Sequence, residues 1–303
     1  MTQLLDFSIN VLQMGLIFAI MVLGVYITYR ILDFPDLSVD GSFVTGAAVA
    51  SILILNGVNP FIACLAAFAA GLGAGLITGF LHVKLGITNL LSGILVMIGL
   101  YSINLRIMGK SNLPLFNNET IFSLEMHPLI VIAAFAVASK LLLDFLLSTK
   151  LGFLIIGTGD NPDMITSLGI DTGKMKILAL MISNGLVALA GSIMAQYQRF
   201  ADVGMGTGIV VMGLASIIFG ETLFRRVPIM LPTTMALLGS ILYRFSIGAA
   251  LNLGLSPTDL KLVTCVIIVF ALSAGNAHRF TGFRRLLKGG FAGASAKRSV
   301  QNL

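Results

Sequence analysis

The sequence predicts an all-α protein, a polytopic transmembrane bundle of about 8–10 spans with broken or short helices. Two observations support this fold class. The 303 residues are 57% hydrophobic and only 11% charged, with a mean hydropathy of +0.99, whereas soluble domains carry about 25% charged residues. The apolar residues also form long runs, and a helix needs roughly 20 of them to cross a bilayer. Such a chain is a multi-pass membrane protein rather than a soluble enzyme.

The apolar runs give the expected elements in chain order. The ranges expected to be helical are 9–31, 42–55, 61–83, 90–108, 129–147, 177–196, 209–219, 229–246 and 262–274. Two of them, 42–55 and 209–219, are shorter than a bilayer crossing requires. They resemble each other, because GSFVTGAAVAS at 41–51 can be aligned with GTGIVVMGLAS at 206–216. Short segments at matching positions of two inverted halves point to a transport pathway, although two Gly/Ala-rich helices can also match by chance.

The run at 61–83 carries small residues at a spacing of four, namely Ala67, Gly71, Gly75 and Gly79. Residues four apart lie on one face of a helix. Small side chains on one face allow the backbone of a neighbouring helix to come close. We therefore predict tight packing of another helix against this face, in preference to a role in lining the solute pathway.

The run at 129–147 contains two charged residues, Lys140 and Asp144. Charged groups at membrane depth are costly and often functional. These two are four residues apart near one end of the run, so an i,i+4 ion pair with a lysine stem reaching toward the interface is the simpler expectation.

The positive charges predict the orientation in the membrane. If the first helix runs from outside to inside, most of the 19 lysines and arginines lie on the cytosolic side, as the positive-inside rule requires. Topology then explains the net charge of +6 better than binding to nucleic acid does. We expect a single transmembrane domain at 1–280, a cytosolic loop at 150–176 and a basic cytosolic tail at 281–303.

The sequence lacks the motifs of several enzyme classes. It contains no G-x-x-x-x-G-K-[ST] phosphate loop, no H-E-x-x-H and no G-x-S-x-G, so we expect no catalytic residues, no metal site and no cofactor in this chain. The cysteines Cys64 and Cys265 both lie in apolar runs and are expected to be buried thiols. Acidic residues cluster at loops and helix ends rather than deep in the spans, which disfavours an ion-coupled secondary transporter. That class, and a membrane scaffold or sensor, remain the alternatives.

The loop at 150–176 encodes a short helix at about 162–168. Asn161 is a good N-cap, Pro162 suits the first helical position, and Asp163 places negative charge in the first turn. Gly169 can close the helix in the left-handed conformation. A helix this short is not stable alone, so we expect another element or a partner to hold it.

This stretch, GDNPDMITSLGIDTGKMK, resembles the cytosolic coupling segment of permeases in the branched-chain amino-acid and ribose class of bacterial ABC importers. The matching residues are Gly159, Asn161, Leu168, Gly169, Ile170, Lys174 and Lys176. The small pair usual inside the helix is replaced here by Ile165 and Thr166. The segments at 183–221 and 32–51 resemble the same family, and the resemblance covers most of residues 15–275.

The resemblance implies a permease subunit in the bacterial cytoplasmic (inner) membrane that forms the pathway for a small, amino-acid-like solute. It further implies three kinds of protein partner besides the lipid bilayer. These are cytosolic ATP-binding subunits, which would hold the ATP and Mg²⁺, an extracytoplasmic solute-binding protein, and a second permease copy in a homodimer.

The resemblance also implies residue roles in coupling. The residues expected to couple to the ATPase are Gly159, Asp160, Asn161, Pro162, Asp163, Met164, Ile165, Leu168 and Gly169. We expect Met164, Ile165 and Leu168 to form one apolar face that docks in a groove, with Asp160 and Asp163 at its rim. The alternative is an ordinary capped helix lying on the membrane face.

For the pathway, our hypothesis is that the outer Gly-rich break and the short helices line it. The candidate residues are Ser42, Thr45, Asn184, Asp202, Gly204 and Gly206. Each of them could instead be structural. Asn184 in particular is a polar group at membrane depth that could join two helices or face the pathway.

Overall fold

The computed structural model describes residues 2–123, 125–224 and 230–252, together with 262, 264–266 and 269. Most of the expected last span, 262–274, and the whole tail at 281–303 lie outside these residues. The described part confirms the all-α fold class. Seven of its helices are long and apolar enough to cross a membrane: α1 (Thr2–Tyr26, continued by the π-helix η1, Ile27–Ile31), α2 (Ser38–Leu55), α3 (Pro60–Val83), α4 (Asn89–Met108), α5 (Pro128–Ser148), α8 (Thr172–Gln198) and α10 (Pro232–Asn252).

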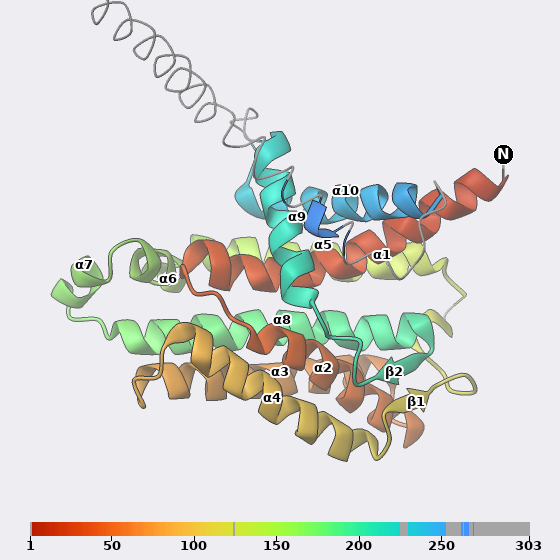
Figure 1. The fold of residues 1–303 in the computed structure, drawn as a ribbon, viewed down its shortest axis with the longest axis horizontal. Coiled ribbons are helices and arrows are strands. Elements are labelled where there is room, and N and C mark those ends of the chain that lie inside the picture. The colour runs from red at the N-terminus through yellow and green to blue at the C-terminus, as the bar shows by residue number, and fades with distance from the viewer. Residues whose placement is uncertain are drawn as a thin grey trace, which may run out of the picture.

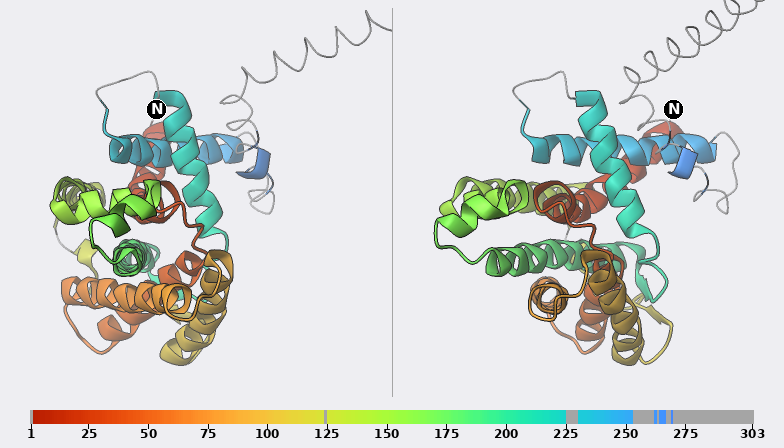
Figure 2. Two further views of the ribbon diagram at one scale, coloured as in Figure 1. Left: turned by 90° about the vertical axis from the view of Figure 1, so that its left-hand side faces the viewer. Right: turned by 60° about the vertical axis from the view of Figure 1, so that its left-hand side comes forward.

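The helix α9 (Ile209–Phe224) is shorter than the others. In Figures 1 and 2 it runs steeply across α1 and α10, whereas the axes of those helices and of α8 lie roughly along one line, irrespective of chain direction. The sequence predicts that this segment and the run at 42–55 are both too short to cross the bilayer. The prediction of a short helix is confirmed for α9 but is wrong for α2, which has 18 residues. The reason is local, because the Asp36 carboxylate accepts the Ser38 N–H at 2.8 Å and thereby starts α2 four residues before the predicted position.

The central helix of the bundle is α8, which packs against α1, α2 and α3. The small residues of α3 bring its backbone close to that of α8, as predicted. A Cβ added at Gly71 would lie 2.4 Å from the Asn184 carbonyl oxygen, and one added at Gly75 would lie 2.2 Å from that of Leu180. No side chain larger than hydrogen fits at such distances, so the interface depends on these glycines.

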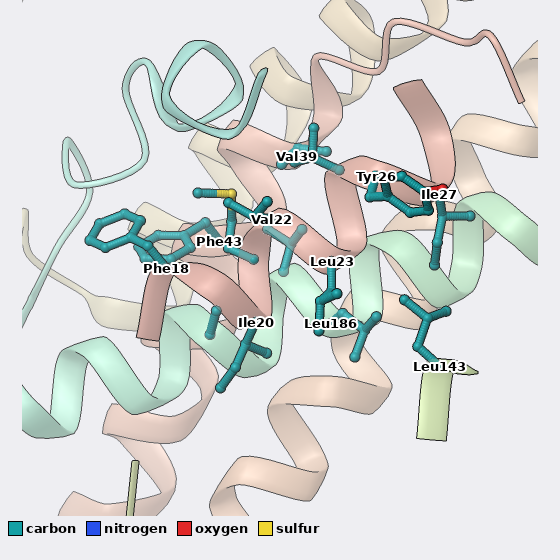
Figure 3. Packing of buried hydrophobic residues seen from close by; sticks show 14 of the residues in the cluster. Phe18, Ile20, Val22, Leu23, Tyr26, Ile27, Val39, Phe43, Leu143 and Leu186 are labelled. Carbon is teal, nitrogen blue, oxygen red and sulfur yellow. The ribbon is translucent and has the colours of Figure 1, made fainter. Parts of the chain in front are cut away.

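The apolar core gathers around α1, whose residues from Ile17 to Leu23 are all buried. Figure 3 shows Phe18 of α1 beside Phe43 of α2; their rings are stacked with centroids 6.1 Å apart. A span that is buried on all sides is shielded from lipid by its neighbours. The helix α1 is therefore an inner helix of the bundle.

The packing supports the predicted internal repeat. Helix α3 packs on α8, and α10 packs on α1; likewise α2 pairs with α3, and α9 pairs with α10. Figure 1 shows α1 and α8 running in opposite directions. The segments α1–α3 and α8–α10 therefore correspond to each other in an inverted arrangement.

The two ends of the bundle carry different elements. At one end lie α6 (Lys150–Asp160) and α7 (Pro162–Ser167). At the opposite end the strands β1 (Asn112–Pro114) and β2 (Phe200–Asp202) pair antiparallel, and η2 (Ile121–Ser123) follows β1 in the chain.

The expectation that 150–176 is a loop with one short helix is wrong for its first part. Thr149 caps α6 by accepting the Gly152 N–H, and α6 packs on α5 and α8.

Candidate functional site

The short helix α7 forms as its capping residues predict. The Asn161 side-chain oxygen accepts the Met164 N–H at 3.1 Å, Pro162 occupies the first turn, and Gly169 has a φ of +79°. These features satisfy backbone groups that a six-residue helix leaves without partners.

The apolar residues of α7 point in two directions. Ile165 is 3% exposed, whereas Met164 and Leu168 are 56% and 61% exposed. The expectation that Ile165 belongs to the same exposed face is wrong. A Cβ added at Gly157 of α6 would lie 2.7 Å from Ile165 Cδ1, so Ile165 fixes α7 onto α6. The exposed apolar pair is Met164 and Leu168, which are four residues apart and thus on one face.

Contacts on either side tie α7 to the membrane helices. On its N-terminal side, a Cβ at Gly159 would lie 1.7 Å from the Ile31 carbonyl oxygen, so the end of α6 lies directly against η1. On the C-terminal side, the Asp171 carboxylate accepts the N–H groups of Gly173 and Lys174 at the start of α8. The residues that flank α7 therefore contact η1 on one side and cap α8 on the other.

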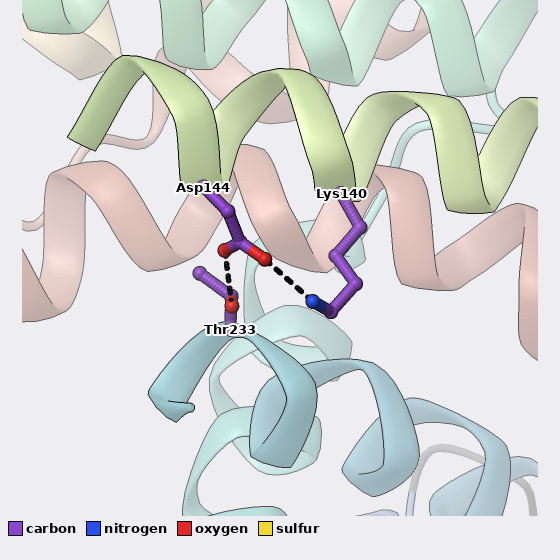
Figure 4. A network of polar contacts seen from close by, with 3 residues as sticks. All are labelled: Lys140, Asp144 and Thr233. Carbon is purple, nitrogen blue, oxygen red and sulfur yellow. Dashed lines mark hydrogen bonds and ion pairs between the residues drawn. The ribbon is translucent and has the colours of Figure 1, made fainter. Parts of the chain in front are cut away.

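Charged residues join further helices of the bundle. Arg30 Nε lies 3.0 Å from Glu221 Oε1, which connects η1 to α9. Figure 4 shows Asp144 of α5 accepting hydrogen bonds from Lys140 and from Thr233 of α10. The predicted i,i+4 pair is confirmed, and its carboxylate also holds α10.

Two predicted pathway residues, Ser42 and Asn184, meet in a buried polar network. Ser42 Oγ donates to Asn184 Oδ1 at 2.6 Å, and Asn184 Nδ2 donates to Asp36 Oδ2 at 2.9 Å. Ser38 Oγ donates to Asp36 Oδ1 at 2.6 Å. All four residues are at most 3% exposed. This network joins α2 to α8 and compensates the buried carboxylate, so its members act as internal links in this conformation rather than as lining residues.

The starts of α2 and α9 meet at Asp40. Its carboxylate accepts the Gly208 N–H at 2.9 Å and the Val210 N–H at 2.8 Å, which are otherwise unpaired groups at a helix N-terminus. Gly206 lets the preceding loop come close, since a Cβ there would lie 2.2 Å from the Asp40 carbonyl oxygen.

A cleft of about 340 Å³ opens beside this contact, between α2, α4 and the segment that joins β2 to α9. Polar lining comes from Asp40, Ser102, Asn104 and Thr207, and Tyr101 adds an aromatic ring. A larger cavity of about 520 Å³ between α3, α5 and α8 is lined almost wholly by apolar side chains, so it offers little for recognising a polar solute.

The structure brings only some of the predicted pathway residues to this cleft. Gly206 lines it. Thr45 is 5% exposed and donates to the Gly41 carbonyl one turn earlier. Asp202 instead ends β2, and Gly204 lies in the following turn, where its N–H donates to Asp202 Oδ1 at 2.8 Å.

The sequence hypothesis missed Asp40, Tyr101 and Asn104 as lining residues. Asn104 could have been chosen as a candidate, because it is an amide in the middle of an apolar run. Asp40 could also have been chosen, because it is an acidic residue at the start of a short segment. Neither feature shows by itself that the two residues face a common space.

Comparison with known proteins decides the family. The profile of the family described as branched-chain amino acid transport system / permease component matches residues 7–272. The chain belongs to this family. The permease is also 53% identical over 270 residues to the tyrosine transport system permease protein of Clostridioides difficile, covering 89% of this chain and 92% of the relative.

More distant relatives carry other solutes in their names. The ribose import permease protein RbsC of Escherichia coli is 26% identical over 88% of this chain and 84% of the relative. The probable branched-chain amino acid transport permease protein LivH of Methanocaldococcus jannaschii is 25% identical over 66% of this chain and 69% of the relative. No solved structure matches the chain significantly.

The family and the seven apolar helices agree on the class of protein. The chain is the permease component of an ABC transporter and a multi-pass protein of the cytoplasmic membrane. Its relatives are transport permeases and not enzymes.

Proposed function

We propose that this permease forms the translocation pathway for an amino-acid-like solute with an aromatic side chain, tyrosine being the first candidate. The observation that supports the solute class is the 53% identity, over nearly the whole of both chains, to a tyrosine transport system permease. The cleft between α2 and α4 fits such a solute, because it combines an aromatic ring with carboxylate, amide and hydroxyl groups.

We propose further that transport is driven by separate ATPase subunits, which hold ATP and Mg²⁺ and receive α7 in a surface groove. Met164 and Leu168 supply the exposed apolar pair that such a groove takes up. Asp160 and Asp163 are exposed beside it and are available for ion pairs at the rim. An extracytoplasmic binding protein delivers the solute, and a second copy of the permease completes the pathway.

The contacts of α7 suggest how force reaches the pathway. In this proposal a displacement of α7 reaches η1 and α1 through the close contact of Gly159 with Ile31, and it reaches α8 through Asp171, the residue that caps that helix. The ion pair of Arg30 with Glu221 extends the connection to α9, whose N-terminus is held by Asp40 at the cleft. A movement of α7 is thereby coupled to the elements that border the cleft.

Reconstituted uptake tests this function. The permease is incorporated into liposomes with its ATPase subunits and binding protein, and uptake of radiolabelled L-tyrosine is measured with and without internal ATP. We expect uptake that requires ATP and the ATPase. Uptake driven by an ion gradient without ATP would refute the mechanism, and ATP-driven uptake of ribose but not tyrosine would refute the solute class.

A further inference from the structure

The amide of Asn104 has one end bonded and the other free. Its Nδ2 donates to the Gly41 carbonyl oxygen at 3.2 Å. Among the described residues, no group donates to Asn104 Oδ1, although the residue is 0% exposed. Rotating the amide by 180° would place its oxygen against the Gly41 carbonyl oxygen, so the contact with Gly41 fixes which end is free.

A buried acceptor without a donor is costly, and most such atoms in proteins have a partner. Asn104 lines the cleft between α2 and α4. A ligand in the cleft can therefore supply the hydrogen bond that the protein does not. The ligand atom has to be a donor, because the free atom is an oxygen.

The charges around the cleft favour a cationic donor. Asp40 lines the cleft, and within the described residues it forms no ion pair. No lysine, arginine or histidine is among the described lining residues. The described part of the chain also holds no group of three His, Cys, Asp or Glu suited to a metal ion, so an organic ammonium group fits better than a divalent metal.

We infer that the cleft between α2 and α4 binds the ammonium group of the solute, with Asn104 Oδ1 as hydrogen-bond acceptor and Asp40 as counter-charge. Tyr101, which is 57% exposed, lies beside it to contact the apolar body of the solute. The inference rests on the proposed function for the amino-acid-like class of the solute and adds which part of that solute the permease recognises.

Protection of a cysteine in the cleft tests this binding in the permease alone. Ser102 lines the cleft, and Ser102→Cys is introduced after replacing the exposed Cys265 with serine. The rate of maleimide labelling is then measured with tyramine, with 3-(4-hydroxyphenyl)propionate, or with 4-ethylphenol. These probes share a phenol ring and differ in carrying an ammonium, a carboxylate or no charge.

We expect tyramine to slow labelling and the other two probes to have little effect. Asn104→Leu should raise the tyramine concentration for half-protection about tenfold or more, as expected when a hydrogen bond to a charged group is lost. Asn104→Asp, which keeps an oxygen at this position, should retain protection. Equal protection by 4-ethylphenol, or unchanged protection in Asn104→Leu, would overturn the inference.

A matched control tests whether the loss of protection is specific to the unpaired oxygen of Asn104 or follows the loss of any unpaired buried polar atom. Ser51 on α2 is also fully buried, and its Oγ has no hydrogen-bond partner among the described residues, but it does not line the cleft. Ser51→Ala should leave protection by tyramine unchanged; a loss equal to that of Asn104→Leu would count against the inference. The assay needs neither ATP nor the partner subunits, so its result is independent of whether tyrosine uptake is observed.

Discussion

Ile165 and Leu168 belong to the same short helix but have different surroundings. Ile165 is covered by α6, whereas Leu168 projects from the bundle with 61% of its surface exposed. Together with Met164 it forms the exposed apolar pair that the proposed ATPase groove would cover. The difference separates a residue that holds α7 in place from one that is available to a partner.

Leu168→Asp should leave the fold intact and disrupt coupling. The new carboxylate lies in water when the permease is free, so we expect unchanged membrane insertion and elution on size-exclusion chromatography. In the proposed groove the charge would be buried without a partner, and ATP-driven uptake should fall at least about tenfold, as for the loss of about 1.4 kcal/mol of binding. Proteoliposome uptake measures this effect.

Two neighbouring positions serve as controls for Leu168→Asp. Ser167→Asp adds the same charge at an exposed polar position and should preserve uptake. Ile165→Asp should instead destabilise the permease itself, because the charge enters a buried site. Normal uptake by Leu168→Asp would contradict the docking role of α7.

At the scale of the elements, α3 and α8 are held together by backbone proximity rather than by bulky side chains. Gly75 is the clearest case, since its Cα faces the Leu180 carbonyl oxygen with no room for a methyl group. Lipid tails are as apolar as leucine, so close van der Waals contact is the main force that joins helices in a bilayer. The spacing of the small residues indicated this face correctly from the sequence.

Gly75→Ala should separate α3 from α8 and destabilise the permease by about 1–3 kcal/mol, the usual cost of overpacking. Gly73 lies on the same helix, and a Cβ there would meet nothing within 4 Å. Gly73→Ala is therefore the matched control and should be neutral or slightly stabilising. Thermal unfolding of the purified variants in detergent measures both effects, and equal losses would contradict the packing argument.

The helices and the pathway residues differ in how far the sequence could predict them. The run at 61–83 became α3 (Pro60–Val83) because hydropathy and the Asn59–Pro60 cap are both local. The early start of α2 depends on a cap from the preceding loop, which hydropathy does not detect. The cleft could not be predicted, because Asn104 meets Gly41 across 63 residues of sequence and only the packing of α4 on α2 brings them together.

At the scale of the whole molecule, the proposed docking helix and the paired strands β1 and β2 lie at opposite ends of the bundle (Figure 1). The positive-inside rule assigns α7 to the cytosol and the paired strands to the exterior. The cleft lies between α2, α4 and the segment after β2. In the proposed function, energy input at α7 and solute entry near the strands are thus separated along the membrane normal.

Labelling from either side tests this orientation. Met164 and Asn112 are both exposed, one at each end. With Cys265 replaced by serine, a membrane-impermeant maleimide should label Met164→Cys in inverted vesicles and Asn112→Cys in right-side-out vesicles. Labelling of both positions from the same side would refute the topology.

The contact between Asp40 and the start of α9 sets an order for biogenesis. Asp40 and Gly208 are 168 residues apart, so translation must pass the middle of the chain before the carboxylate can acquire these two donors. The first half therefore lacks this contact until the second half has been made. We expect the Asp40 end of α2 to reach its final structure only when α9 packs beside it.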